Sequence, residues 1–405
     1  MNKQNFLIKN SIPNKYLKPT ILKKFANKIK PILEKIKKEI NLPDKTLHVL
    51  SKKFNFNFNF KDLKSFNKYQ TIALVGMGGS ILGTEALYDS LKSKIKKKVY
   101  FFNNLDEDQI SNFKKKENFS KILFIVISKS GNTVETLSNA LSLNILKKNS
   151  KNVIIISEKK NNSLFLITKQ LNLYYIEHKS YIGGRYSVLS EVGVVPAYLM
   201  GLNVNKLRSH NNEFLKKGAS SLLKADTIKI ASLINSNKFN SLIFLNYSPE
   251  LEKFLYWAQQ LIAESLGKKG KGFLPVISNV PKDHHSLLQL YLDGPKDKFF
   301  YIFSCEKKSN VKINLNKSSH INKYLNKKDL SKIKSAQRKA LIKAFIEKKI
   351  PFREFKIKTI NEKVLGKLFA LFIVETIIVG NLLRVNPFDQ PAVERVKDYT
   401  KQFLS

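Results

Sequence analysis

Cysteine is almost absent from this chain, whose 405 residues include a single one, Cys305. One cysteine excludes an internal disulfide and fits a protein of a reducing compartment. Histidine is also rare, and four of the six histidines stand alone: His48, His178, His210 and His320. Isolated histidines without cysteine partners do not form the spaced ligand clusters of a metal site. We therefore expect no metal, and we interpret these four histidines as structural or exposed.

Arginine and the acidic residues are scarce beside lysine. Only six of the 72 basic residues are arginine, and the 31 acidic residues leave a formal net charge of +41 at pH 7. Such an excess raises nucleic acid or an anionic membrane as partners. Nucleic-acid readers, however, use arginine and gather their basic residues on one face, whereas lysine is spread over nearly this whole chain. We interpret the charge as compositional drift and expect no specific nucleic-acid partner.

Long hydrophobic runs are missing as well. The most apolar window, "LFALFIVETIIVGNLL", is too short for a comfortable membrane span and contains Glu375 and Asn381, so it predicts a buried helix. The basic stretch "KKFANKIKPILEKIKKEI" lacks arginine and contains Glu34 and Glu39, which does not fit a transit peptide. We expect no membrane partner and a cytoplasmic location.

The N-terminal part of the chain differs in pattern from the rest. Residues 1–45 place apolar side chains at helical spacing between lysines, which predicts a helical segment. The stretch "FNFNFNF" (54–60) follows and alternates as a strand does, although we favour a loosely packed segment of biased composition. An exposed strand of this flat and uncharged kind would be prone to aggregation.

Beyond this point, β-branched apolar runs alternate with helical segments. Four runs precede residue 205: "TIALVGMGGS", "KVYFFNN", "KILFIVISKS" and "NVIIISE". Four more follow it: "SLIFLNYS", "GFLPVISNV", "KFFYIFSC" and "FREFKIKTI". The alternation predicts an α/β fold with two tandem units, each a doubly wound parallel sheet flanked by helices. We expect domains at 46–205 and 206–375, with a helical segment at 376–405.

Two turns at strand ends have the composition of ligand loops. "GMGGS" (76–80) lacks the acidic residue of a dinucleotide fold and the Gly-Lys-Ser/Thr of a Walker loop, so a plain tight turn explains it equally well. "SKSGNTVET" supplies four candidate ligands at a helix start: Ser128, Lys129, Ser130 and Thr133. Hydroxyls, an ammonium group and the helix N-terminus suit a phosphate monoester. An N-cap would explain only one of the three hydroxyls, so we predict phosphate binding.

Six motifs together resemble a known family. "GMGGSILG", "SKSGNTVET", "GGRYSVLSEVG", "AESLGKKGKG", "HSLLQLYLDGP" and "NPFDQPAVERVK" occur in the order and rough spacing of the glucose-6-phosphate isomerases, from about residue 70 to the C-terminus. The resemblance implies two sugar-isomerase (SIS) domains of flavodoxin-like fold, a homodimer, and no metal or cofactor. It also implies reversible isomerisation of glucose 6-phosphate to fructose 6-phosphate through a cis-enediol, in glycolysis and gluconeogenesis.

The resemblance assigns roles to single residues. Glu264 matches the family's base, which moves a proton between C1 and C2 of the sugar. Arg185 matches the residue whose permanent charge stabilises the enediolate oxygen. Gly79 and Ser80 match residues that line the sugar, and the four candidates of the "SKSGNTVET" loop match the phosphate contacts.

Ring opening is assigned to other groups. The family places a histidine four residues before a glutamine, so Gln289 identifies His285 as the ring-opening acid and leaves His284 a bystander. In the family this histidine reaches the active site of the neighbouring subunit, which makes the dimer necessary for activity. Lys397 matches a lysine that assists ring opening, and Gln390 matches a glutamine that contacts substrate, so the C-terminal segment is expected to complete the active site.

Two positions depart from the family pattern. Ala392 stands where glycine is usual, and Glu191, one turn beyond Arg185, stands where a small residue is usual and is expected to pair with Arg185 or a lysine. Three alternative functions stay open: an isomerase that accepts mannose 6-phosphate or another sugar phosphate, a non-catalytic sugar-phosphate sensor, and a basic nucleic-acid binder. Retention of the whole catalytic set argues against a sensor.

Overall fold

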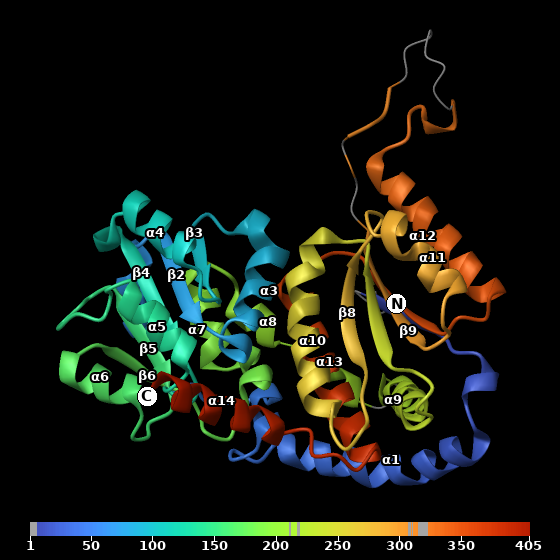
Figure 1. Cartoon of the computed structure of the whole chain (residues 1–405), viewed down its shortest axis with the longest axis horizontal. Coiled ribbons are helices and arrows are strands. Elements are labelled where there is room, and N and C mark those ends of the chain that lie inside the picture. The colour runs from blue at the N-terminus through green and yellow to red at the C-terminus, as the bar shows by residue number, and fades with distance from the viewer. Residues whose placement is uncertain (1–5, 210–211, 217–218, 307–308, 310, 315–322) are drawn as a thin grey trace.

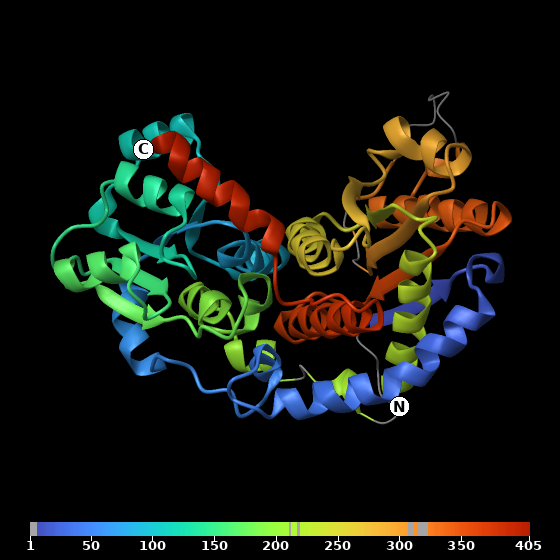
Figure 2. The same ribbon diagram turned by 60° about the horizontal axis from the view of Figure 1, so that its bottom comes forward.

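The computed structural model describes residues 6–209, 212–216, 219–306, 309, 311–314 and 323–405, so His210 and His320 lie outside the described residues. Two α/β domains lie side by side (Figure 1), and the long helix α1 (Pro19–Ile40) packs on α9 (Ala219–Asn235) and α13 (Glu362–Leu382) of the second domain. Turning the molecule shows the two domains joined along one side (Figure 2).

The first domain has a five-stranded sheet of order β3-β2-β4-β5-β6 in which each neighbouring pair is parallel. Its strands are β2 (Thr71–Gly76), β3 (Lys98–Phe102), β4 (Ile122–Ile127), β5 (Val153–Ser157) and β6 (Tyr174–Glu177). Its helices are α2 (Phe60–Leu63), α3 (Leu82–Leu91), α4 (Glu107–Lys116), α5 (Val134–Ser142), α6 (Ser163–Leu171), α7 (Glu191–Leu199) and α8 (Val204–Arg208). This is the flavodoxin-like order, and the predicted fold class is confirmed.

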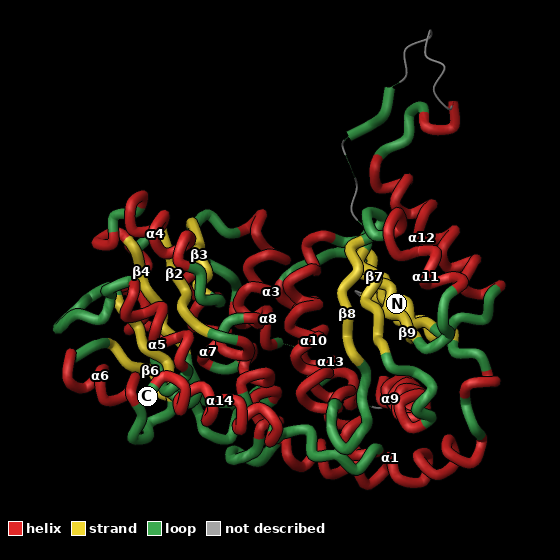
Figure 3. Tube along the Cα trace, viewed as in Figure 1, coloured by secondary structure: helices red, strands yellow, loops and turns green. Residues whose placement is uncertain are grey.

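The second domain repeats the parallel pattern in the order β10-β9-β7-β8. Its strands are β7 (Ser241–Asn246), β8 (Leu274–Asn279), β9 (Lys298–Cys305) and β10 (Phe352–Ile357). Besides α9 and α13, its helices are α10 (Glu252–Leu266), α11 (His284–Asp293) and α12 (Leu330–Glu347), and the C-terminal helix α14 (Pro391–Leu404) follows α13. Colouring the Cα trace by secondary structure (Figure 3) shows each sheet between layers of helices.

The N-terminal segment is not helical throughout, contrary to the prediction for residues 1–45. Strand β1 (Phe6–Ser11) pairs antiparallel with β10 and completes the second sheet at its edge. Its mixture of lysine and asparagine with apolar residues suits an edge strand, because only one side of the strand is hydrogen-bonded to the sheet. Residues 54–59 of "FNFNFNF" form no strand despite their alternation, in agreement with the favoured interpretation. Its four phenylalanine rings contact one another in sequence, and the guanidinium of Arg208 lies 4.9 Å from the ring of Phe54.

Helix α13 is the centre of the core. It is the one described helix long and apolar enough to cross a membrane, but 89% of its most apolar window is buried inside the fold, as the sequence predicted. Its Phe369 packs edge-on against Trp257 with ring centroids 4.7 Å apart. The boundary expected at residue 375 falls inside this continuous helix.

A buried ion cluster ties the second domain together. Arg353 on β10 donates two hydrogen bonds, of 2.8 and 2.9 Å, to the carboxylate of Glu375 on α13. It also reaches Asp226 on α9 at 3.2 Å and Asn10 on β1 at 2.8 Å. Bidentate, charge-assisted bonds of this kind fix orientation as well as contributing energy. Glu375, whose charge indicates a buried helix rather than a membrane span, is therefore an internal ion-pair partner of Arg353.

Candidate active site

Glu264 lies in the last turn of α10, where the second domain meets α3 of the first. Its Oε1 accepts a hydrogen bond of 2.9 Å from Gln260 one turn earlier, and its Oε2 accepts one of 3.0 Å from Arg185. The side chain remains 32% exposed, so the carboxylate is held in place while part of it faces solvent. A positioned and accessible carboxylate is what a general base requires.

Arg185 is buried, with 2% of its side chain exposed, and all five of its N–H donors are used. Nε donates to Ser265, and Nη1 donates to Glu264 and to Oε1 of Gln390, the latter at 2.9 Å. Nη2 donates to the carbonyl oxygens of Pro387 and Asp389 at 2.6 and 3.0 Å. The guanidinium thus joins the "GGRYS" turn, helix α10 and the C-terminal loop.

Gly79 forms the wall beside this arginine. A Cβ added at Gly79 would lie 2.2 Å from the carbonyl carbon of Gly184 and 2.5 Å from the nitrogen of Arg185. Ser187 Oγ donates to the carbonyl oxygens of both glycines, at 3.2 Å for Gly79 and 2.7 Å for Gly184. The "GMGGS" turn therefore needs glycine for close approach of two backbones, and Ser80 follows it in a buried position.

The "SKSGNTVET" loop lies between β4 and α5. Ser128 Oγ and Ser130 Oγ lie 2.9 and 3.4 Å from Thr133 Oγ1, so the three hydroxyls face one another. Thr133 is the N-cap of α5 but its side chain caps no backbone N–H. The N-cap alternative is therefore not realised. Because β2 and β4 are adjacent parallel strands, this loop and Gly79 lie at the same edge of the sheet.

The ammonium group of Lys129 is paired with Glu158, the residue that follows the next strand, β5. Its Nζ lies 3.5 Å from Oε1 of Glu158, whose Oε2 lies 2.7 Å from Lys160. Burial lowers the pKa of Lys129, and the carboxylate of Glu158 partly opposes that effect. Asn162 sits where a Cβ on Gly131 would be, and Gly131 has a φ of +67° that favours glycine. The β5–α6 loop thus supports the candidate phosphate loop from behind.

His285 is not brought to Glu264 within one chain. His285 is exposed on α11, which packs through Tyr291 on the sheet face formed by Ile243, whereas α10 covers the opposite face. Its neighbour His284 instead contacts the hydroxyl of Tyr247 through Nε2 at 3.1 Å. Lys397 is exposed on α14 and forms an ion pair of 2.8 Å with Glu394.

The two departures from the family pattern also have positions. Glu191 is fully buried and lies 3.7 Å from Lys179 rather than pairing with Arg185, and it accepts a hydrogen bond from the backbone N–H of Asn57. Burial raises the pKa of the Glu191 carboxyl. Ala392 is exposed in the first turn of α14. Neither residue is among the hydrogen-bond partners of Arg185.

Sequence reasoning missed several supporting residues. Gln260 lies four residues before Glu264 on a helix, a spacing that places both on one face, and could have been found from it. Tyr186 and Ser265 hydrogen-bond each other at 2.8 Å and hold the arginine from behind, but each looks like an ordinary neighbour of a motif residue. Glu158 carries no local signal at all. Over the described residues, no three His, Cys, Asp or Glu side chains gather as potential metal ligands.

Comparison with known proteins identifies the family. The family model described as phosphoglucose isomerase matches residues 52–405. A probable glucose-6-phosphate isomerase of Methanococcus maripaludis is 32% identical over 95% of this chain and 90% of its own length. A glucose-6-phosphate isomerase of Methanocaldococcus jannaschii is 33% identical over 84% of this chain and 86% of its own length.

Solved structures share the fold. A hypothetical protein of Thermus thermophilus superimposes with a TM-score of 0.82 at 22% identity, over 98% of this chain and all of that one. A glucose-6-phosphate isomerase of Chlamydia trachomatis superimposes with a TM-score of 0.79 at 17% identity, over 99% of this chain and 88% of that one. With its six motifs, the family model and these relatives in agreement, this chain belongs to the phosphoglucose isomerase family.

Proposed function

We propose that this protein interconverts glucose 6-phosphate and fructose 6-phosphate with Glu264 as the base. Membership of the family supports the reaction, and one observation carries the residue assignment. The carboxylate of Glu264 is held by Gln260 and Arg185 beside the Gly79 turn while part of it stays accessible. In the forward direction the carboxylate takes the proton from C2 of the open-chain sugar, and the enediol then receives a proton at C1.

Arg185 acts as the electrostatic partner of this transfer. As C2 loses its proton, negative charge develops on the neighbouring oxygen, and a fixed guanidinium in a buried setting stabilises that charge without reorganisation. The pairing with Glu264 also orients the base before substrate binds. Gln390 accepts a hydrogen bond from the same Arg185 Nη1 as Glu264 does, and it is a further substrate contact in this proposal.

The phosphate is anchored by the loop that follows β4. Ser128, Ser130 and Thr133 present hydroxyls to one another at the N-terminus of α5, and Lys129 adds a positive charge. In the absence of substrate these hydroxyls bond one another, and a phosphate dianion replaces those bonds with charge-assisted ones. Anchoring the phosphate keeps the reacting carbons near Glu264, which is the positional contribution to catalysis.

Ring opening requires a second subunit in this proposal. His285 lies across the second sheet from the helix that carries Glu264, so a partner chain has to supply this histidine. Lys397 on the exposed α14 assists once the helix settles against the site. We therefore propose a homodimer in the cytoplasm, a location consistent with a chain that has one cysteine.

The direct test is Glu264→Gln, which keeps the shape of the side chain and its contact with Gln260 but removes the base. Turnover should fall at least ~10²-fold while KM changes little, because substrate is held mainly by its phosphate. A coupled assay with fructose 6-phosphate measures both constants. A variant that retained wild-type turnover would remove Glu264 from this role. Mannose 6-phosphate, assayed in parallel, decides the substrate range.

A further inference from the structure

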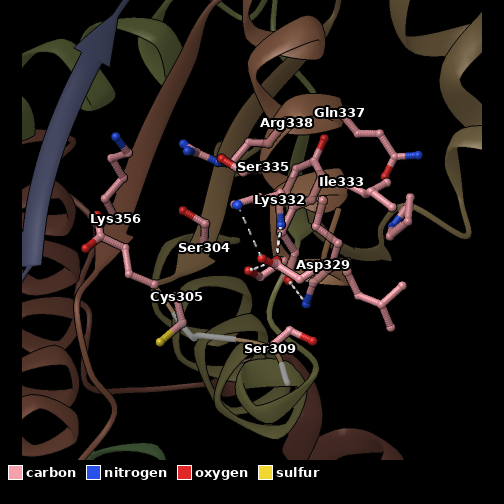
Figure 4. Close-up of a pocket in the computed structure, with 16 residues that line it drawn as sticks. Ser304, Cys305, Ser309, Asp329, Lys332, Ile333, Ser335, Gln337, Arg338 and Lys356 are labelled. Carbon is pink, nitrogen blue, oxygen red and sulfur yellow. Dashed lines mark hydrogen bonds and ion pairs between the residues drawn. The ribbon is translucent and has the colours of Figure 1, made fainter. Parts of the chain in front are cut away.

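A separate crevice of about 1320 Å³ opens at the carboxyl edge of the second sheet (Figure 4). It is lined by the ends of β7, β9 and β10 and by the first turns of α12, through residues that include Tyr247, Ser304, Lys356 and Arg338. Glu264, Arg185 and the candidate phosphate loop are not among the residues that line it. The proposed catalytic machinery therefore leaves this crevice unexplained.

The crevice occupies the topological position of the phosphate loop in the first domain. The first sheet runs β3-β2-β4-β5 and the second runs β8-β7-β9-β10, so β7 corresponds to β2 and β9 to β4. The phosphate loop follows β4 and opens α5, and the crevice lies where β9 ends and α12 begins. In open parallel sheets, ligands bind outside the carboxyl ends of the strands at this switch point.

The lining residues are rich in cations and hydroxyls. Figure 4 shows Lys356, Ser304 and Arg338 around one side of the space, with Lys332 and Asp329 facing them. Arg338 is 7% exposed and pairs with Glu354 beneath it. Within the part of the chain that the structure describes, Lys356 makes no ion pair. Burial and the nearby charge of Arg338 both lower the pKa of Lys356, so an anion placed beside it would be favoured.

The helix end itself is already occupied. Asp329 caps α12 by accepting a hydrogen bond of 2.8 Å from the backbone N–H of Lys332. Glu306 adds a second acidic group to the lining. A phosphate at this site is therefore held by side chains rather than by the helix N-terminus, unlike the arrangement at α5. Lys334 lies close by, where its Nζ approaches the carbonyl oxygen of Tyr247 at 3.4 Å.

We propose that this crevice is a second binding site, which takes a small phosphorylated molecule between Lys356, Lys334 and Arg338. The crevice exceeds the roughly 300–1,000 Å³ of most ligand pockets, so it has room for a phosphate group and an organic body. Hydroxyl groups of Ser304 and Ser335 supply further donors, whereas that of Ser331 donates to Asp329. The proposal concerns binding alone and does not depend on how the first site catalyses isomerisation.

Inorganic pyrophosphate is the probe, titrated calorimetrically into the full-length protein and into its Lys129→Ala variant, which weakens the candidate phosphate loop of the first domain. Fructose 6-phosphate is left out, because a phosphorylated sugar would compete for both sites. Binding to Lys129→Ala then reports on the second site. We expect one site per chain whose affinity falls with salt, because lysine charges supply most of the attraction. Lys356→Ala should weaken this binding at least ~10-fold, which corresponds to about 1.4 kcal/mol.

The matched control is Lys343→Ala, which removes an equal charge from α12 at a side chain that is 81% exposed and pairs with Glu347. Its pyrophosphate affinity should be unchanged. Equal effects of both variants would mean that the general charge of the chain attracts the probe. Absence of pyrophosphate binding to Lys129→Ala would also overturn the proposal. Loss of binding in Lys129→Ala but not in Lys356→Ala would place the probe in the first site and overturn the proposal.

Discussion

Arg185 of the first domain donates a hydrogen bond of 3.0 Å to Glu264 of the second. Its remaining donors hold the C-terminal chain at Pro387 and Asp389 as well as the amide of Gln390. One guanidinium therefore fixes the proposed base, the "GGRYS" turn and the approach to α14 relative to one another. Packing of the two domains and the proposed chemistry depend on the same side chain.

Arg185→Lys should impair both the packing of the two domains and the proposed chemistry. Lysine keeps the charge but cannot make five bonds in a planar fork, so the C-terminal chain and Glu264 lose their common support. We expect kcat to fall about 10²- to 10³-fold, as for loss of an oxyanion-stabilising group, and the melting temperature to fall with it. Arg395→Lys, on the exposed face of α14, is the matched control and should leave both unchanged. Wild-type turnover in Arg185→Lys would contradict the assignment.

Gly79→Ala should separate the two glycine turns. The new methyl group would lie 2.2 Å from the backbone of Gly184, and backbone cannot move as a flexible side chain does. The cost should be about 1–3 kcal/mol of stability, with loss of activity as Arg185 is displaced. Gly184→Ala provides the comparison, because its Cβ would meet nothing nearer than 3.6 Å. Thermal unfolding and coupled assays measure both, and similar effects of the two substitutions would refute the close-approach argument.

Glu158→Gln should strengthen substrate binding at neutral pH. The variant frees Lys129 from a competing carboxylate, and removing one unit of negative charge near the phosphate changes binding by about 1 kcal/mol, or a roughly fivefold lower KM. Without Glu158 the pKa of Lys129 falls further, so the rise of KM at alkaline pH should begin at a lower pH than in the wild type. The pH profile of KM checks both statements, and an unchanged profile would exclude contact between Lys129 and the phosphate.

Mixed dimers should test whether His285, the proposed ring-opening acid, comes from the partner subunit of the proposed homodimer. A dimer formed from one Glu264→Gln chain and one His285→Ala chain has one complete site only if the histidine comes from the partner. Random pairing of two inactive chains should then restore about 25% of wild-type activity, since half of the dimers are mixed and each has one site of two. Co-expression with two tags isolates the mixed dimer. No recovery would mean that each chain uses its own histidine, and His284→Ala should lose little activity in either case.

His178 should make the protein sensitive to acid. It is buried, its Nδ1 lies 2.9 Å from the carbonyl oxygen of Lys179, and burial lowers its pKa from 6.5 to about 4. Between those values the unfolded chain binds a proton that the folded chain does not, so stability falls as the pH falls from 6.5 towards 4. The loss amounts to about 3 kcal/mol. His178→Asn keeps a donor for the carbonyl and should flatten this part of the stability profile, measured by urea unfolding. An equally steep profile in the variant would contradict this cause.

The sequence predicted the inner strands better than the outer ones. All eight predicted runs are strands, because buried parallel strands are continuous β-branched stretches such as Ile122–Ile127. The two that were missed, β1 and β6, lie at sheet edges, where polar residues interrupt the pattern. The stretch "FNFNFNF" alternates as a strand does but forms none, as the favoured interpretation expects, and its rings pack against one another.

For the site, motifs located residues that local patterns could not connect. Gly79, Arg185, Glu264 and Gln390 are far apart in sequence and meet only because two sheets and two loops converge. Neither hydrophobic periodicity nor secondary-structure propensity predicts contacts between residues so far apart in the sequence. Glu158 could not be found from the sequence, because its role comes entirely from its pairing with Lys129, which follows the neighbouring strand.

Strand β1 has a consequence for the order in which the chain can assemble. Residues 6–11 find their partner only at 352–357, so β1 can join the second sheet only after β10 has been synthesised. The first domain, whose strands all lie between residues 71 and 177, has no such wait. Loop closure over so long a separation is slow. Strand β1 is therefore among the last elements of the second domain to reach its native place.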